Sequence, residues 1–348
     1  MKRKHFLSMV LGMGAIIPAM AQQPVRNNES EEEELGEDMP CKVPPYLQPG
    51  DTIGITCPAG YITYDQILPA IRIMESWGYK ILIGKTVGAR DFTFGGTDAE
   101  RLADLQAMLD NPKVQAIMCA RGGYGVARIV DGLQFDKFKQ HPKWVIGFSD
   151  ITVLHAHIQR NCHVASIHSK MCNSFPDEFK TADPIVQQTI LSIRQALSGE
   201  KMTYTVELDP KNRLGTANGE LIGGNLAMLQ SIAATKSDIQ TAGKILFLED
   251  TGEYLYSIDR MLGNLARAGK LAKLNGLIMG GFTKIKADDP GEEFGKSVYD
   301  IVLEKVKDYK YPVCFNFPVG HIRNNFALKC GVKHRLRVDA SGVSFAEI

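Results

Sequence analysis

The segment Lys143-Trp-Val-Ile-Gly-Phe-Ser-Asp-Ile-Thr152 determines the fold that we expect for this chain. Its apolar run Trp144–Ile146 is typical of a buried strand, and a helix is predicted to follow a few residues later. Ser149 stands at the junction, with Gly147 two residues before it. The arrangement resembles a nucleophile elbow, in which a sharp strand-to-helix turn exposes a hydroxyl. Asp150 and Ile151 depart from the general G-x-S-x-G pattern, so these residues alone leave open a helix-capping role for Ser149.

Outward from this segment, short apolar runs alternate with helical stretches. Apolar strands separated by amphipathic helices predict a parallel sheet that is covered on both faces. We therefore expect an α/β fold whose first domain, residues 44–199, is a doubly wound, mostly parallel sheet that carries Ser149. The predicted strands are 51–57, 79–83, 114–120 and 144–146, and the predicted helices are 65–77, 99–109 and one from about 151.

A polar stretch, residues 200–217, is predicted to link this domain to a second, smaller α/β domain, residues 218–348. The C-terminal part, 326–348, is expected to form several short strands with turns between them. The other strands predicted here lie near 220 and at 244–248 and 276–279, and the helices start at 226, 257 and 296.

The N-terminus has the pattern of a secretory signal peptide, residues 1–21. A basic start, Lys2-Arg-Lys4, precedes an apolar stretch at 6–17 and the small-x-small site Ala19-Met-Ala21. The apolar stretch is short for a membrane span, so cleavage is favoured over an uncleaved anchor. Residues 22–43 are rich in Glu and are interpreted as a disordered linker. We expect an exported protein of the bacterial periplasm, soluble after signal cleavage.

Composition argues against several classes of function. The formal net charge is +1 and no basic face is concentrated in the sequence, so no nucleic-acid partner is expected. The seven cysteines are scattered without a C-x-x-C pair and are predicted to be mostly buried free thiols. His155 and His157 would point to different faces of a helix, and no metal site is expected.

A glycine-rich segment, Ala120-Arg-Gly-Gly-Tyr-Gly-Val-Ala-Arg128, follows the predicted strand 114–120. Its glycines allow backbone amides to face a ligand at the carboxyl end of a strand. It does not fit the dinucleotide pattern G-x-G-x-x-G, and residues 291–297 are one residue short of a phosphate loop. Neither segment is therefore interpreted as a nucleotide site.

A nucleophilic serine requires a base and a carboxylate that orients the base. Glu249 and Glu253 stand at the end of the predicted strand 244–248, and His321 follows an apolar run and Gly320. Spacing alone leaves open whether these groups meet Ser149.

Five segments occur along the chain in the order Arg121–Gly125, Gly147–Asp150, Gly223–Leu226, Leu248-Glu-Asp250 with Asp259-Arg260, and Gly320-His321. Together they resemble the LD-carboxypeptidase family of serine peptidases, over about residues 50–340. Many members have Gly-Pro after the His near residue 168, whereas this chain reads His168-Ser-Lys-Met171, a departure that concerns details of the substrate pocket.

The resemblance implies a triad of Ser149, His321 and Glu249, with Glu253 as the alternative carboxylate. It implies an oxyanion hole made by the backbone N–H of Asp150 and of Gly122 or Gly123. Arg121 and Asn225 are candidates for contacting substrate or ordering loops.

The resemblance further implies release of D-alanine from murein tetrapeptides in cell-wall turnover, without a cofactor, by an enzyme that pairs as a homodimer. Two alternatives remain open. One is a peptidase of the same fold acting on an acylated nucleotide antibiotic or another amide. The other is a non-enzymatic periplasmic binding protein with two domains.

Overall fold

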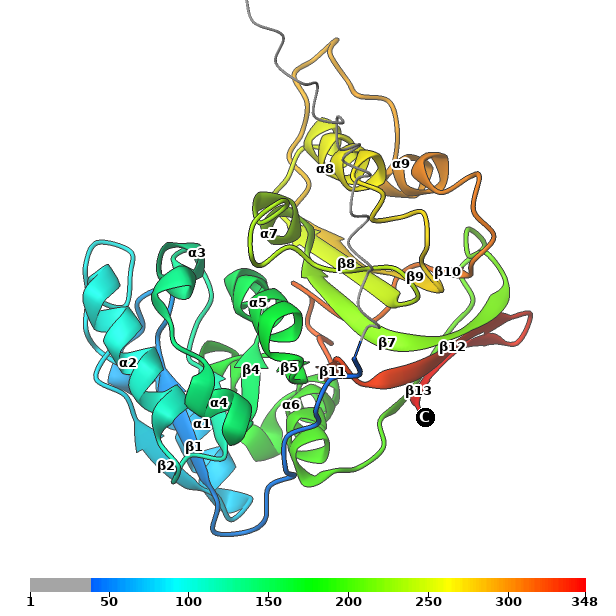
Figure 1. Cartoon of the computed structure of the whole chain (residues 1–348). Coiled ribbons are helices and arrows are strands. Elements are labelled where there is room, and N and C mark those ends of the chain that lie inside the picture. Colours follow the sequence, from blue (N-terminus) through cyan, green and yellow to red (C-terminus); the bar gives the residue numbers. More distant parts are fainter. Residues whose placement is uncertain (1–38) are drawn as a thin grey trace, which may run out of the picture. The chain divides into compact units, whose positions relative to one another are not determined.

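The computed structural model describes residues 39–348, which form two sheets with their helices (Figure 1). The predicted signal peptide, residues 1–21, lies outside the described residues, as does all of the predicted linker except its last five residues. Within residues 39–348, no helix combines the length and the apolar character that crossing a membrane would require.

The first sheet has six strands in the order β11-β5-β4-β3-β1-β2, and all neighbours except β11 and β5 are parallel. The prediction of a mostly parallel sheet is therefore confirmed. The strands are β1 Thr52–Thr56, β2 Lys80–Ile83, β3 Ala116–Cys119, β4 Trp144–Gly147, β5 Ser166–His168 and β11 Leu328–Cys330.

Helices cover both faces of this sheet, as the apolar strands require. In β3, Ile117 faces a core formed with α2, α3 and α5, whereas its neighbour Met118 faces a core formed with α1 and α6. Capping boxes fix the starts of α1 at Thr63 and of α2 at Thr97. The helices are α1 Tyr64–Ser76, α2 Asp98–Asp110, α3 Val126–Ile129, α4 Asp136–Gln140, α5 Thr152–Cys162 and α6 Pro184–Ser198.

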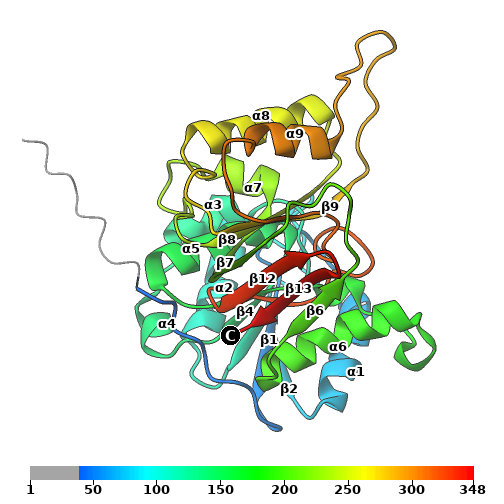
Figure 2. The ribbon, with the colours of Figure 1, turned by 90° about the vertical axis from the view of Figure 1, so that its right-hand side faces the viewer.

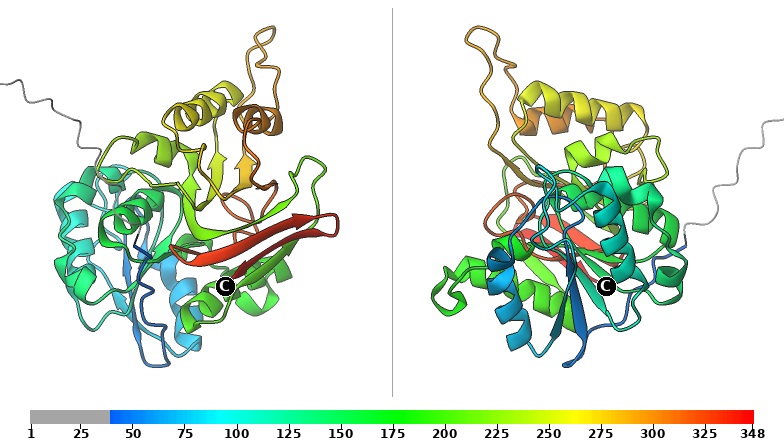
Figure 3. Two further views of the ribbon diagram at one scale, coloured as in Figure 1. Left: turned by 45° about the vertical axis from the view of Figure 1, so that its right-hand side comes forward. Right: turned by 90° about the vertical axis from the view of Figure 1, so that its left-hand side faces the viewer.

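The second sheet has seven strands in the order β10-β9-β8-β7-β12-β13-β6 and is mixed. Its long strand β7 pairs with β12 in an antiparallel manner through residues 215–220 and with β8 in a parallel manner through 221–225. Helices α8 and α9 lie side by side over one face of it (Figure 2). The loop at 284–297 projects away from the sheets in both views of Figure 3. The elements are β6 Thr203–Val206, β7 Gly215–Asn225, α7 Leu226–Ser231, β8 Ile245–Thr251, α8 Leu255–Arg267, β9 Gly276–Thr283, α9 Val298–Lys305, β10 Val313–Cys314, β12 Lys333–Asp339 and β13 Gly342–Glu347.

Two details differ from the domain organisation expected from the sequence. The stretch 200–217, interpreted as a link, contains β6, which pairs with β13 of the second sheet. Strand β11 belongs to the predicted second domain but pairs with β5 of the first sheet, Leu328 opposite His168. The last segment of the chain therefore joins both sheets, because each sheet offers it an unpaired strand edge.

The two sheets also share one apolar core. The cluster that includes Leu154 of α5 and Ile117 of β3 continues through Leu229 of α7 to Leu248 of β8. Six of the seven cysteines are buried, which agrees with the predicted burial of most of them.

A close backbone approach joins α5 to the end of β7. The backbone N–H of Asn225 donates a hydrogen bond of 3.1 Å to Thr152 Oγ1, across the two sheets. A Cβ on Gly224 would lie 2.5 Å from the same oxygen, and Gly224 has φ +143°. Only glycine fits this position without displacing α5.

We expect Gly224→Ala to lower the free energy of unfolding by about 3 kcal/mol, since it combines backbone strain with an overpacked contact. The matched control is Gly243→Ala, where φ is +73° and no atom lies within 4 Å of the added Cβ. The control should lose only about 1 kcal/mol, from backbone strain alone. Urea unfolding of both variants measures the difference, and equal losses would contradict the close approach.

Candidate active site

Ser149 lies on a strained turn between β4 and α5. Its φ is +64°, in the left-handed region, which costs a residue other than glycine about 1 kcal/mol. A single turn of 3-10 helix, Ser149–Ile151, leads into α5. A Cβ on Gly147 would lie 2.9 Å from Ile151 Cγ1, so glycine is needed where the strand turns. The elbow predicted from the sequence is confirmed as local geometry, and Ser149 is partly exposed.

Two buried side chains hold this turn in place. Asp150 Oδ2 accepts a hydrogen bond of 2.8 Å from the backbone N–H of Val126, at the start of α3. His155 on α5 donates from Nε2 to the carbonyl oxygen of Gly147, at 2.9 Å. Burial raises the pKa of Asp150 to about 6 and lowers that of His155 to about 4. His155 is therefore neutral near pH 7 because of its burial, and the neutral ring still donates from Nε2 to this carbonyl oxygen.

The glycine-rich loop passes directly beside the hydroxyl of Ser149. A Cβ on Gly122 would lie 3.1 Å from Ser149 Cβ and 3.3 Å from Ser149 Oγ. The carbonyl oxygen of Gly122 accepts a hydrogen bond of 2.9 Å from the backbone N–H of Gly60. Gly123 has φ +113°, which only glycine adopts readily. The loop therefore brings its backbone, rather than side chains, to the serine.

The structure brings His321 and Glu249 to Ser149. His321 Nε2 lies 3.2 Å from Ser149 Oγ, and His321 Nδ1 lies 2.7 Å from Glu249 Oε2. Glu249 is fully buried, whereas the His321 side chain is 22% exposed. With Nδ1–H donating to the carboxylate, the lone pair of Nε2 faces the hydroxyl, which is the arrangement of a general base.

The turn that carries His321 is fixed by Glu249 and Asn325. The backbone N–H of His321 donates to Glu249 Oε2 at 3.1 Å, so this oxygen accepts from both the ring and the backbone. The backbone N–H of Gly320 donates to Asn325 Oδ1 at 2.8 Å. Gly320 has φ +104°, and a Cβ there would lie 2.5 Å from Glu249 Cβ. A glycine is therefore required before His321 by the close approach of β8 to this turn.

Glu253, the alternative carboxylate, does not contact His321. It lies beyond the end of β8, and its carbonyl oxygen accepts a hydrogen bond of 3.0 Å from the backbone N–H of Lys286. It lines a separate surface pocket together with Arg260. The geometry therefore pairs the histidine with Glu249.

Asn225 and Arg121 both order loops. Asn225 caps α7 by accepting from the backbone N–H of Met228, and its Nδ2 donates to Asp250 Oδ1 at 2.9 Å. Burial raises the pKa of Asp250 to about 6, although three hydrogen bonds to its carboxylate oppose this. Arg121 is exposed and donates from Nη1 to the carbonyl oxygen of Tyr61 at 2.8 Å.

Three further residues at the site were not singled out from the sequence. The ring of Phe148 packs against His321 with centroids 4.9 Å apart, and the Lys170 ammonium lies 5.7 Å from the centroid of the same ring. Asn325 holds the Gly-His turn by accepting from the backbone. Phe148 directly precedes Ser149, and Asn325 follows His321 by four residues. Their nearness in sequence to these two residues is the signal that could have identified them.

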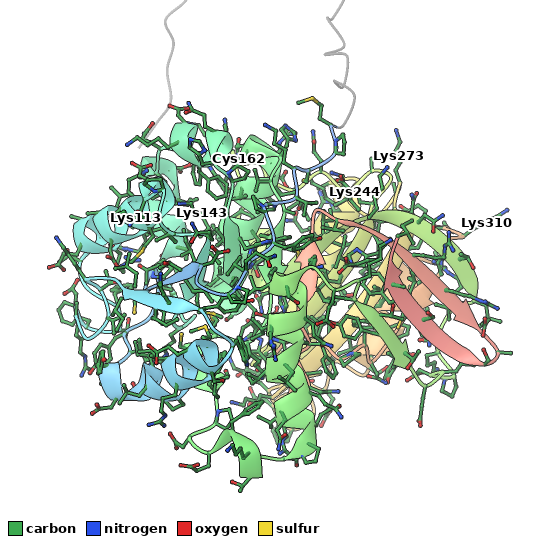
Figure 4. All side chains as sticks on the ribbon, turned by 90° about the horizontal axis from the view of Figure 1, so that it is seen from below. Lys113, Lys143, Cys162, Lys244, Lys273 and Lys310 are labelled. Carbon is green, nitrogen blue, oxygen red and sulfur yellow. The ribbon has the colours of Figure 1, made fainter. Side chains whose placement is uncertain are left out.

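The carboxyl ends of β4 and β8, one strand from each sheet, meet at this site. Lys143 and Lys244, which directly precede β4 and β8, are labelled in the view from below in Figure 4. Ser149 and Glu249 lie at the other ends of the same strands.

Among residues 39–348, no three His, Cys, Asp or Glu side chains are grouped so that they could hold a metal ion.

Comparison with known proteins places this geometry in a family. Profiles of the LD-carboxypeptidase N-terminal and C-terminal domains match residues 53–169 and 218–336. A probable murein peptide carboxypeptidase of Bacillus subtilis is 34% identical over 292 residues, covering 83% of this chain and 90% of the relative.

Two other comparisons bear on the substrate. The crystal structure of muramoyltetrapeptide carboxypeptidase from Oxalobacter formigenes superposes with a TM-score of 0.75 and 26% identity, covering 85% of this chain and 98% of that one. The microcin C7 self-immunity protein MccF of Escherichia coli is 26% identical over 332 residues, covering 86% of this chain and 94% of the relative.

We expect the neutral state of His155 to make folding depend on pH. An unfolded histidine titrates near pH 6.5 and the folded one near 4, so the stability it contributes is complete above pH 6.5 and is lost as the pH falls toward 4. The loss should reach roughly 3 kcal/mol. His155→Gln, which keeps a donor to Gly147, should flatten this part of the pH profile in urea unfolding. An unchanged slope between pH 6.5 and 4 in the variant would show that His155 is not its source.

Proposed function

The chain belongs to the LD-carboxypeptidase family and is a serine carboxypeptidase, and on this premise we propose that it releases terminal D-alanine from murein tetrapeptides. The observation that carries the proposal is the hydrogen-bonded series Ser149–His321–Glu249 at the carboxyl ends of both sheets. The names of the two murein-peptide relatives support the substrate class.

In the proposed mechanism, His321 Nε2 takes the proton of Ser149 as the hydroxyl oxygen attacks the carbonyl carbon of the scissile amide. Glu249 holds Nδ1–H and stabilises the imidazolium that forms. His321 then gives the proton to the leaving amine, and D-alanine departs. The same imidazole then deprotonates a water molecule, which hydrolyses the ester bond between the peptide and Ser149.

We assign the oxyanion hole to the backbone N–H of Asp150 and that of Gly122 or Gly123. The N–H of Asp150 stands at the start of a helical turn, where backbone donors lack partners within the helix. Gly122 lies beside the Ser149 hydroxyl, since a Cβ added to Gly122 would be 3.3 Å from Ser149 Oγ. Donors fixed in this manner contribute about 10²- to 10³-fold each to the rate.

The compartment and the assembly are also inferences. We infer export to the periplasm from the signal-peptide pattern of residues 1–21. The homodimer expected from the family resemblance stays a prediction, which sedimentation of the mature chain would test.

The first test is Ser149→Ala. Because the variant lacks the nucleophile, we expect kcat/KM for D-alanine release from a muropeptide digest, followed by mass spectrometry, to fall at least 10³-fold. A fluorophosphonate probe should label the wild type and not the variant. Unchanged release in the variant would contradict the enzymatic proposal and favour a binding protein.

The same assay separates the substrates. Faster hydrolysis of an aminoacyl-nucleotide amide than of the tetrapeptide would favour the alternative, a peptidase of the same fold that acts on an acylated nucleotide antibiotic.

The second test separates the two carboxylates. We expect Glu249→Gln to lower kcat about 10³-fold, since the amide cannot stabilise the imidazolium as the carboxylate does. Glu253→Gln is the matched control and should keep the wild-type rate within about threefold, because Glu253 does not contact His321. A larger loss at Glu253 than at Glu249 would show that the geometric pairing is not the functional one.

A further inference from the structure

Lys170 is a half-buried cation that the proposed catalytic cycle does not use. Its Nζ donates one hydrogen bond, of 2.6 Å, to the carbonyl oxygen of Ile322, and it lies 5.7 Å from the centroid of the Phe148 ring. Among the described residues, no carboxylate lies within ion-pair distance of it. An ammonium group carries three donors, so two remain for other partners.

The position of this ammonium relates it to the triad. Ile322 directly follows His321, and Phe148 directly precedes Ser149. The Phe148 ring touches both groups, since its centroid lies 4.9 Å from that of His321. Met171, which directly follows Lys170, places its Cε 3.2 Å from the position that a Cβ on Gly122 would occupy, and that position is next to Ser149. Lys170 therefore lies against the residues that flank the Ser149–His321 pair.

Burying a cation without an ion pair is unfavourable, because water is removed without an opposite charge to compensate. Burial lowers the pKa of Lys170, and the negative charge of Glu249 acts in the opposite direction. The charge of Glu249 thus reaches Lys170, but Glu249 is held by His321 and does not bond to the ammonium. An anion supplied by a ligand would complete the site.

A carboxypeptidase substrate supplies such an anion at a defined place. His321 must protonate the leaving amine, so the leaving amino acid has to lie against His321. In an α-amino acid, the nitrogen and the carboxylate carbon are only about 2.5 Å apart. The terminal carboxylate is therefore delivered to the His321–Ile322 side of the site, where the Lys170 ammonium lies.

We propose that Lys170 binds the terminal carboxylate of the substrate and so makes the enzyme select a free carboxyl end. This inference rests on the proposed function and adds the residue that reads the leaving group. The ammonium would donate a charge-assisted hydrogen bond to the carboxylate, which is stronger than one to a neutral amide.

The experiment compares a murein tetrapeptide that ends in D-alanine with the same peptide ending in D-alaninamide. The wild type should prefer the free carboxylate by roughly 10- to 100-fold in kcat/KM. Lys170→Met, which keeps an apolar stem against Phe148, should lose that preference by slowing the carboxylate substrate while sparing the amide. Lys170→Gln provides a second neutral variant in case the first does not fold.

Arg323→Met is the matched control. Arg323 is an exposed cation on the loop that carries His321 and Ile322, and it is already paired with Asp183 at 2.9 Å. Its substitution should leave the preference unchanged. Labelling by a fluorophosphonate probe should be equal in all variants, since the triad is intact in each.

The outcomes distinguish the two levels of the proposal. If the wild type cleaves neither peptide, the proposed function is overturned and this inference with it. If the wild type cleaves the tetrapeptide but the Lys170 variants slow both peptides equally, Lys170 only balances the charge of Glu249 and the inference alone is overturned. Unchanged selectivity in these variants, or its loss in Arg323→Met, would overturn the inference as well.

Discussion

The arrangement of the molecule depends on one contact, the bond of 2.7 Å between His321 Nδ1 and the fully buried carboxylate of Glu249. Glu249 comes from β8 of the second sheet, and the imidazole that it orients reaches Ser149, which follows the carboxyl end of β4 in the first sheet. A buried carboxylate is tolerated only where donors satisfy it, and here the ring and the backbone N–H of His321 both donate to one oxygen. The proposed function requires the two sheets to pack so that Ser149 from the first and Glu249 from the second reach the same imidazole.

Several unfavourable local features are concentrated at this contact. Ser149 has a left-handed backbone, and Glu249 Oε1 is buried without a hydrogen-bond partner among the described residues. Strain of this kind persists only where surrounding packing determines it. The shared core from α5 to β8 supplies that packing, together with the Thr152–Asn225 bond and the strand β11 that the C-terminal segment adds to the first sheet. The rigid parts of the fold thus hold a site that short segments could not maintain alone.

The charges around the site are arranged on two sides. On one side, the backbone of the glycine-rich loop passes beside Ser149 at Gly122, where the proposed oxyanion hole would hold an oxygen that becomes negative only during the reaction. On the side of His321 and Ile322, the Lys170 ammonium lies at the carbonyl oxygen of Ile322, and in its proposed role it would bind a carboxylate that is negative throughout the reaction. In the proposed function, these two environments give a physical reason why the enzyme would cut the bond next to a free carboxyl end.

The sequence by itself determined the features that are local. The elbow at Ser149, the alternation of strands and helices, and the burial of the cysteines follow from apolar periodicity, turn residues and helix capping, which act over a few residues. The candidate base and carboxylates could be named for the same reason, since they stand at the ends of apolar strands. Only the tertiary structure brought Glu249, rather than Glu253, into contact with His321, paired β11 with the first sheet and placed Lys170 beside Ile322 and Phe148. The Glu249–His321 and Lys170–Ile322 contacts join residues 72 and 152 positions apart along the chain, and such distances are closed by the packing of whole sheets rather than by any local preference.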